Sequence, residues 1–218
     1  IHSSNDYLQK NINNWLVFQT GLLNSIADME LLNASNSTDT INKNNLILKS
    51  LNSQLQYRNI ALVDNTGKAI LAGNPKRIGA DYSQMDYLIE AKRKSNKVII
   101  SNVRFSRVDG TPLISFAKSL PNNGAMFTSV PLKNLYKDYV ATDRKDEFDY
   151  SFILTSKCEP LAHPQMENNN FDYSSLCSDK ELVTFEENGE SYIASISKNP
   201  LTRWYVVSAT NVKSINSI

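Results

Sequence analysis

The chain has 218 residues with a formal net charge of +1 at pH 7, and 41% of its residues are hydrophobic and 21% charged. These values are ordinary for a folded globular protein, and they argue against both a general nucleic-acid-binding surface and a disordered acidic chain. No apolar run approaches the ~20 residues that cross a bilayer, and no signal peptide opens the chain; both features are expected equally of a soluble protein and of a segment cut from between two membrane spans.

The first 32 residues are predicted to form one long helix. Apolar residues recur at spacings of three, four and seven, which places them in one stripe along a helix, and Gln19 is the one polar residue in that stripe. At 1.5 Å per residue the helix would be ~40 Å long, which is more than one small sheet requires. We therefore expect part of it to project or to pair with a second copy of the chain. The stripe consists of Leu8, Ile12, Trp15, Leu16, Leu22, Leu23, Ile26 and Met29.

After an Asn- and Ser-rich loop and a second helix that ends near Tyr57, the pattern changes to short strands joined by tight turns. Turns are indicated at Asp64–Gly67, Asp109–Gly110 and Asn188–Gly189, because Asn and Gly accept the backbone angles of hairpins. Strands joined by hairpins form antiparallel sheets, so the predicted fold class is α+β. Strands are expected at residues 59–63, 68–72, 97–105, 113–119, 125–130, 150–155, 159–164, 181–186, 190–197 and 204–210, and shorter helices at 84–95 and 132–141.

The two cysteines, Cys158 and Cys177, lie close together in the sequence. They are either unrelated buried thiols of a reducing compartment or one disulfide that closes a polar loop. The segment between them contains three consecutive asparagines, 168–170, and has little apolar core of its own, which favours the disulfide. Such a bond would stabilise the fold by ~3 kcal/mol and would indicate an oxidising compartment.

The order of these elements resembles the double Cache domain of bacterial chemoreceptors and sensor kinases. In the first sheet module the resemblance is carried by NIALVDNTGKAILAG (59–73), IGADYSQMDYLIEAKRK (78–94), ISNVRFSRVDGTPLISFAKSL (100–120) and NNGAMFTSVPLKNLYKDY (122–139). In the second module it is carried by YSFILTSKCEPLAHP (150–164) and GESYIASISKNPLTRWYVVSAT (189–210). The resemblance therefore extends over nearly the whole chain and rests on the order of the segments.

This resemblance implies a long N-terminal helix followed by two PAS-like antiparallel-sheet modules. Residues 1–57 would form the long helix and a second helix, residues 58–142 the membrane-distal module with the ligand pocket, and residues 143–218 the membrane-proximal module. The parent protein would be a homodimeric methyl-accepting chemotaxis receptor of the inner membrane, with this domain in the periplasm between two membrane spans. The resemblance implies no enzymatic activity, no cofactor, no metal and no nucleic-acid partner.

The ligand motif of amino-acid-binding members is not reproduced in this chain. Those members carry Arg-x-Trp-Tyr at the head of the pocket helix, where this sequence has Met85, Asp86, Tyr87 and Leu88. Their ammonium-binding aspartate aligns with Ser129, and a tyrosine of the middle strand aligns with Arg104. We therefore expect another small polar ligand, with a carboxylate favoured by the charge of Arg104; alternatively, Arg104 is a solvated residue of a strand edge. The predicted ligand contacts are Met85, Tyr87, Arg104, Phe116, Lys118 and Ser129.

Three alternatives remain at this point. The domain could dock a periplasmic solute-binding protein instead of a small molecule. It could also serve as the input domain of a sensor histidine kinase or a diguanylate cyclase. A hydrolase built on Cys158 and His163 would need a free thiol beside the histidine, and the spacing of the cysteines and histidines matches no common metal site.

Overall fold

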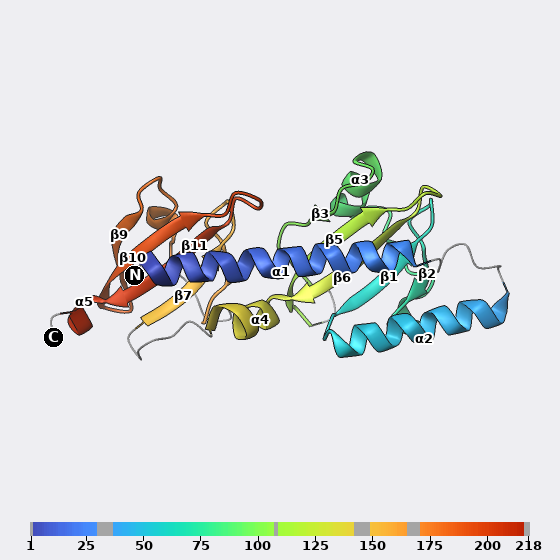
Figure 1. Ribbon diagram of the computed structural model, residues 1–218, viewed down its shortest axis with the longest axis horizontal. Helices are drawn as coiled ribbons and strands as arrows, with labels where there is room; N and C mark the ends of the chain where they lie inside the picture. The colour runs from blue at the N-terminus through green and yellow to red at the C-terminus, as the bar shows by residue number, and fades with distance from the viewer. Residues whose placement is uncertain (1, 30–36, 107–108, 142–148, 165–170, 216–218) are drawn as a thin grey trace. The chain divides into compact units, whose positions relative to one another are not determined.

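The computed structural model describes residues 2–29, 37–106, 109–141, 149–164 and 171–215 (Figure 1). The chain divides into two compact units. We call residues 17–131 the central unit, and residues 1–16 together with 132–218 the terminal unit. The module limits at 58–142 and 143–218 stay predictions, because these units also include parts of the first helix.

The predicted long helix is present as α1 (His2–Asp28). Six residues of the apolar stripe are buried, whereas Leu22 is half-buried and Met29 is 47% exposed at the end of the helix. Gln19, the polar residue of the stripe, is buried and accepts a hydrogen bond from the hydroxyl of Tyr57. The helix ends before residue 30, and the predicted final turn at 30–32 lies outside the described residues. The buried members are Leu8, Ile12, Trp15, Leu16, Leu23 and Ile26.

The central unit is built on an antiparallel sheet of six strands in the order β2-β1-β6-β5-β3, with β4 also pairing with β5 (Figure 1). Its helix α2 (Thr38–Gln54) begins after Ser37, whose side chain accepts a hydrogen bond from the Thr40 amide, and contacts β1 and β2. Helix α3 (Asp86–Arg93) packs against β3, β5 and β6, and the 3₁₀ helix η2 (Pro75–Arg77) follows β2. The strands are β1 (Asn59–Val63), β2 (Ala69–Ala72), β3 (Ile99–Ile100), β4 (Arg104–Phe105), β5 (Pro112–Ser119) and β6 (Ala125–Pro131).

The prediction of a single strand at residues 97–105 is wrong, because this segment forms two short strands, β3 and β4. The interruption begins at Ser101, whose hydroxyl accepts a hydrogen bond from the Ser115 amide at 2.8 Å. In a regular antiparallel ladder that amide donates to a backbone carbonyl. The hydroxyl of Ser101 thus accepts the hydrogen bond that a backbone carbonyl would accept in a regular ladder. The chain leaves the ladder there and pairs with β5 again at Arg104.

The β1–β2 turn gives a testable consequence of backbone geometry. Gly67 has a φ of +92°, and a Cβ added there would lie 2.6 Å from Cα of Ser83. Gly79 has a similar φ of +83°, but a Cβ added there would meet nothing within 4 Å. We expect Gly67→Ala to lower the free energy of unfolding by more than the ~1–2 kcal/mol that positive φ alone costs, and Gly79→Ala by no more than that. Urea denaturation would measure both variants, and equal losses would contradict the steric argument.

The terminal unit contains an antiparallel sheet of five strands in the order β8-β7-β11-β10-β9 (Figure 1). Before the sheet, the helix predicted at 132–141 is only partly regular: α4 (Leu132–Leu135) continues into a π-helical segment, η3 (Tyr136–Val140). A short 3₁₀ helix, η5 (Ser174–Leu176), precedes β9, and α5 (Val212–Ile215) follows β11. The strands are β7 (Asp149–Leu154), β8 (Pro160–Ala162), β9 (Leu182–Glu187), β10 (Glu190–Lys198) and β11 (Tyr205–Asn211).

Asn5 attaches the first turns of α1 to this sheet. Its buried Nδ2 donates to the carbonyl oxygens of Ser195 at 3.0 Å and Val206 at 2.9 Å. We expect Asn5→Ala to lower the free energy of unfolding by ~1–3 kcal/mol, because buried carbonyls lose their donor. Asn14→Ala, at an exposed position of the same helix, should change it by no more than ~0.5 kcal/mol. Equal effects in chemical denaturation would show that Asn5 does not anchor the helix.

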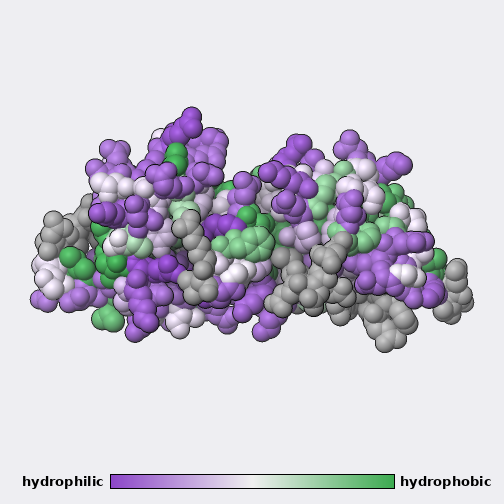
Figure 2. All heavy atoms as spheres, turned by 180° about the vertical axis from the view of Figure 1, so that it is seen from behind, coloured by the Kyte–Doolittle hydropathy of each residue, from purple (hydrophilic) through white to green (hydrophobic). Residues whose placement is uncertain are grey.

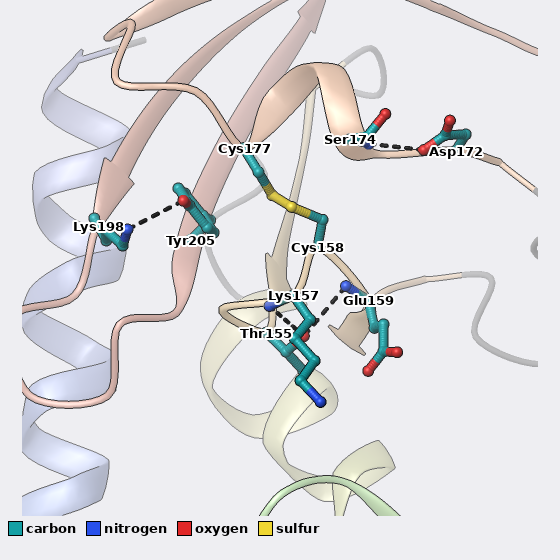
Figure 3. The surroundings of a disulfide bond; sticks show 9 residues. All are labelled: Thr155, Lys157, Cys158, Glu159, Asp172, Ser174, Cys177, Lys198 and Tyr205. Carbon is teal, nitrogen blue, oxygen red and sulfur yellow. Dashed lines mark hydrogen bonds between the residues drawn. A yellow bond between two sulfur atoms is a disulfide. The ribbon is translucent and has the colours of Figure 1, made fainter.

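Cys158 and Cys177 form a disulfide with Cα atoms 6.0 Å apart (Figure 3). Cys158 lies in the turn between β7 and β8, and Cys177 ends the short helix η5. The hydroxyl oxygen of Thr155 accepts hydrogen bonds from the amides of Lys157 and Glu159, which fixes the turn. The predicted disulfide is therefore present and ties the segment around η5 to the edge of the sheet. This segment also contributes Tyr173 and Leu176 to the core, which its polar composition did not suggest.

On the face of the molecule shown in Figure 2, hydrophilic residues predominate and hydrophobic side chains gather only in small patches. Of the helices in the described part of the chain, none combines the length and the apolar character needed to cross a membrane.

Candidate functional site

Three polar side chains lie in a row across the central sheet, on the face that α3 covers. In the strand register Asn59 of β1 lies opposite Ser129 of β6, and Ser129 lies opposite Ser115 of β5. Because side chains alternate between the two faces of a sheet, all three share a face with Ala61, Ala117 and Phe127. Those apolar residues pack in one cluster with Tyr87, Leu88 and Ala91 of α3. The row therefore lies beside the apolar contact between α3 and the sheet.

Arg104 of β4 extends over this row. Its Nη2 donates to Ser129 Oγ at 2.6 Å and to Ser115 Oγ at 2.7 Å, and its Nε donates to Ser115 Oγ at 3.2 Å. The two serine hydroxyls are 2.9 Å apart and hydrogen-bonded to each other. The guanidinium carbon lies 5.3 Å from the ring centroid of Tyr87, within the range of a cation–π contact. These contacts fix the half-buried guanidinium group in one orientation.

The positive charge of Arg104 is not neutralised within the described part of the chain. No carboxylate there lies within ion-pair distance of Arg104, and its Nη1, which carries two donors, makes no hydrogen bond. The buried Asn59 Oδ1 likewise has no hydrogen-bond partner among these residues, and the buried Tyr87 Oη has none of regular geometry, although the Ser115 hydroxyl lies close to it. Burial raises the pKa of Tyr87 although the charge of Arg104 and the Ser115 hydroxyl oppose the shift, so the phenol stays protonated and can donate. The site can thus bind an anion that also offers polar atoms.

Aromatic side chains lie next to the polar row. Tyr82 packs edge-on against Phe127 at 4.9 Å, and its hydroxyl accepts from Asn59 Nδ2 at 3.3 Å. Met85, the residue before α3, packs on the same cluster. Tyr82 also lines a pocket of about 360 Å³ between the β1–β2 turn and α3, together with Ser83, Leu88 and Lys92 among others.

The hairpin that carries Arg104 is attached to the start of β1 by an ion pair. Arg58 Nη2 lies 2.9 Å from the carboxylate of Asp109, and the Arg58 amide donates to the Ser129 carbonyl. Hydrogen bonds from Ser106 and Thr111, with a smaller contribution from Arg58, lower the pKa of Asp109 to about 2. Asp109 is therefore ionised at neutral pH, and the attachment persists there.

The structure brings four of the six predicted contacts together: Met85, Tyr87, Arg104 and Ser129. Phe116 and Lys118 alternate with Ser115 and Ala117 along β5, so they point to the opposite face of the sheet. Phe116 is fully buried there. The sequence interpretation missed Asn59, Tyr82 and Ser115. The alternation of side chains along β5 is the signal that separates Ser115 from Phe116, and the strand register then places Ser115 on the same face as Ser129.

Two other expected chemistries can be examined directly. Cys158 is bonded to Cys177 and has no free thiol, which overturns the hydrolase built on Cys158 and His163. In the described ranges, no group of three or more His, Cys, Asp or Glu side chains is arranged to hold a metal ion.

Comparison with known proteins identifies the family. A family model described as a Cache domain, dCache_1, matches residues 1–217. No curated protein matches the sequence. Among solved structures, the ligand-binding domain of the Campylobacter jejuni chemoreceptor Tlp3 in complex with 4-methylisoleucine is 17% identical, with a TM-score of 0.78 over 99% of this chain and 91% of that one.

Two further solved structures share the fold. The ligand-binding domain of Mlp24 with asparagine is 22% identical, with a TM-score of 0.70 over 98% of this chain and 91% of that one. The ligand-binding domain of the Pseudomonas fluorescens chemoreceptor CtaA in complex with L-alanine is 16% identical, with a TM-score of 0.72 over 97% of this chain and 95% of that one. The family model covers almost the whole sequence, and the α+β fold with two antiparallel sheets agrees with it; the chain belongs to the Cache domain family, in its double-Cache form.

Proposed function

We propose that this chain is the extracytoplasmic sensor domain of a transmembrane chemoreceptor, and that it binds a small carboxylate on the α3 face of the central unit. The observation that carries the proposal is that the Arg104 guanidinium is held in place but not neutralised. It is oriented by Ser115, Ser129 and Tyr87, its Nη1 donors are unused, and no carboxylate among the described residues neutralises it. A carboxylate bound to Nη1 would gain charge-assisted hydrogen bonds without having to order the arginine.

The side chains around Arg104 favour a carboxylate without an ammonium group. The neighbouring structures are complexes with amino acids, and an amino-acid ligand needs an acceptor for its ammonium group. Ser129 stands where the resemblance places an aspartate, and its hydroxyl is already used by Arg104. Tyr87, which the guanidinium faces, carries no negative charge, and neither do Asn59, Tyr82 and Met85 on the same side of the sheet. An α-ammonium would therefore meet the charge of Arg104 without compensation.

The wider assignment follows from the family and the disulfide. The bond between Cys158 and Cys177 suits the periplasm, where disulfides persist. Residues 58–142 would be the membrane-distal module, and α1 would connect to the first membrane span of a homodimeric, methyl-accepting receptor without enzymatic activity of its own. The ligand would act by favouring one of two packings of the sensor, to the extent that its affinity for the two packings differs.

A thermal-shift screen with matched ligand pairs tests this proposal. Each pair differs only in the ammonium group: propanoate with alanine, and succinate with aspartate. A ligand at 100 times its dissociation constant adds ~2.7 kcal/mol of stability, which raises the melting temperature of a chain of this size by several degrees at ~2–4 °C per kcal/mol. We expect stabilisation by a carboxylate that exceeds that by its amino-acid partner. Stabilisation by the amino acids alone would reject the proposal, and no response to any carboxylate or amino acid would favour docking of a solute-binding protein.

A further inference from the structure

The terminal unit buries a second polar cluster, formed by Tyr150, His163, Tyr173 and Glu187. The carboxylate of Glu187, at the end of β9, accepts a hydrogen bond from the hydroxyl of Tyr150 and lies 3.1 Å from Tyr173 Oη, whose single proton can go either to Glu187 or to His163. Nε2 of His163, which follows β8, lies 2.8 Å from Tyr173 Oη and 3.9 Å from Glu187 Oε1. His163 is 3% exposed and Glu187 8% exposed. An imidazole, two phenols and a carboxylate thus form a continuous hydrogen-bonded chain inside the sheet module.

Apolar aromatic rings surround this hydrogen-bonded cluster. Phe152 lies 4.9 Å from the His163 ring, and Phe171 lies 4.7 Å from Tyr173. Burial among these rings lowers the pKa of His163 to about 4, although the charge of Glu187 opposes the shift, so the imidazole is neutral at neutral pH. Burial and the bond to Glu187 also raise the pKa of Tyr150 far above its ordinary value.

Glu187 has no fixed counter-charge within the described ranges. No Lys or Arg there lies within ion-pair distance of it, and His163 is the one basic group that does. Glu190, its cross-strand neighbour, is paired with Lys213 and Asn211 instead. The titratable groups that face His163 and its partners are Tyr150 from β7, Tyr173 from the segment before η5, Glu187 from β9 and Tyr192 from β10.

We propose that this cluster is a proton-binding site, and that it gives the domain a second input separate from the Arg104 site. In the neutral form Nε2 of His163 accepts from the Tyr173 hydroxyl. A proton taken from solvent binds at Nε2, which then donates to Tyr173 Oη, and the Tyr173 hydroxyl donates to Glu187. The new positive charge on His163 is balanced by the carboxylate of Glu187, so the folded state can hold the proton.

Proton binding would be transmitted through Tyr173. This residue and Leu176 of η5 belong to the core cluster on the sheet, and Cys177 attaches the same segment to the β7–β8 turn. Reversing the direction of the His163–Tyr173 hydrogen bond changes how Tyr173 is held, and with it the packing of the segment that covers this face of the sheet. Acidification would therefore alter the terminal unit without any ligand at Arg104.

The sign of the pH dependence follows from linkage. The folded-state pKa of His163, about 4, lies below the ordinary value of 6.5, so the unfolded chain binds the proton first as the pH falls. The stability that neutral His163 contributes is complete above pH 6.5 and is lost progressively from there down to about pH 4. Protonated native protein is populated at the lower end of this window.

Proton NMR of the two histidines, His2 and His163, tests the proposal, with His163→Gln assigning the resonance. In the folded protein we expect the His163 resonance to titrate more than one pH unit below the ordinary value, and near-UV circular dichroism to change with the same midpoint while far-UV circular dichroism stays constant. Glu187→Gln should lower that midpoint further, because the stabilising charge is lost. Glu186→Gln, at the exposed neighbouring position, should leave it unchanged, as should Arg104→Ala.

Four results would each overturn the inference. His163 could titrate at its ordinary value, or the fold could be lost before His163 is protonated. The midpoint could be the same in Glu187→Gln as in the wild type. Finally, His163→Gln could retain the near-UV change, which would assign that change to other groups. None of these results bears on carboxylate binding at Arg104, so the two proposals can fail independently.

Discussion

Arg104→Ala is expected to lower the affinity for the carboxylate ligand by about 10- to 100-fold. A hydrogen bond to a charged group contributes ~1.5–3 kcal/mol, and each 1.4 kcal/mol corresponds to a factor of ten in the dissociation constant. The substitution also removes the cation that lies over Tyr87 and leaves Ser115 and Ser129 without their donor. Isothermal titration calorimetry with the best carboxylate from the screen would measure the change directly.

Two further variants make this result specific. Arg104→Lys keeps the charge but loses the planar donors that a carboxylate can use in pairs, so it should recover only part of the affinity. Arg93→Ala removes an exposed arginine from α3 and should leave the dissociation constant unchanged. A wild-type affinity in Arg104→Ala would show that Arg104 is a solvated strand-edge residue. The melting temperature of each variant without ligand separates lost binding from lost folding.

Replacing both cysteines, Cys158→Ser with Cys177→Ser, is expected to lower the free energy of unfolding by ~3 kcal/mol, the value for closing a loop of this length. The sequence separation of the bonded residues is 19. At ~2–4 °C per kcal/mol the melting temperature should fall by ~6–12 °C. The physical reason is that the released segment gains conformational freedom when the protein unfolds, and in the folded state it is then held on the sheet by the packing of residues such as Tyr173 and Leu176.

Calorimetry with and without a reducing agent provides the control. Reduced wild-type protein should melt near the temperature of the double variant, and the reducing agent should not change the melting temperature of the double variant itself. Equal stability of the oxidised wild type and the double variant would mean that the bond closes a segment already held by its packing.

Local signals in the sequence were sufficient for most of the fold. The apolar stripe predicted α1 because a helix of period 3.6 residues buries one face. Six of its eight residues are buried, and Met29, at the helix end, is the exposed member. The Asn-Gly and Asp-Gly turns located the hairpins because these residues accept positive φ. The break at Ser101 was not predictable in this way, since it depends on the amide of Ser115 on another strand.

The candidate site was harder to predict than the fold. Arg104, Tyr87 and Ser129 could be named from the resemblance, but Asn59 and Ser115 join them only through strand register. A shift of one residue along β5 separates Ser115 from Phe116, and it decides which face each occupies. The cluster of Tyr150, His163, Tyr173 and Glu187 comes from four separate segments. The local sequence around each residue does not predict its contacts with the other three, so these contacts are known only from the tertiary structure.

The division of the chain also has a consequence for biosynthesis. The central unit is one continuous stretch, residues 17–131, whereas the terminal unit needs residues 1–16 together with 132–218. Because a chain is made and translocated from its N-terminal side, the central unit is complete while the terminal unit still lacks its whole sheet. Asn5 has no acceptor for these hydrogen bonds until Ser195 and Val206 have been synthesised. We expect the central unit to fold before the terminal unit, and the first turns of α1 to lack their sheet in that interval.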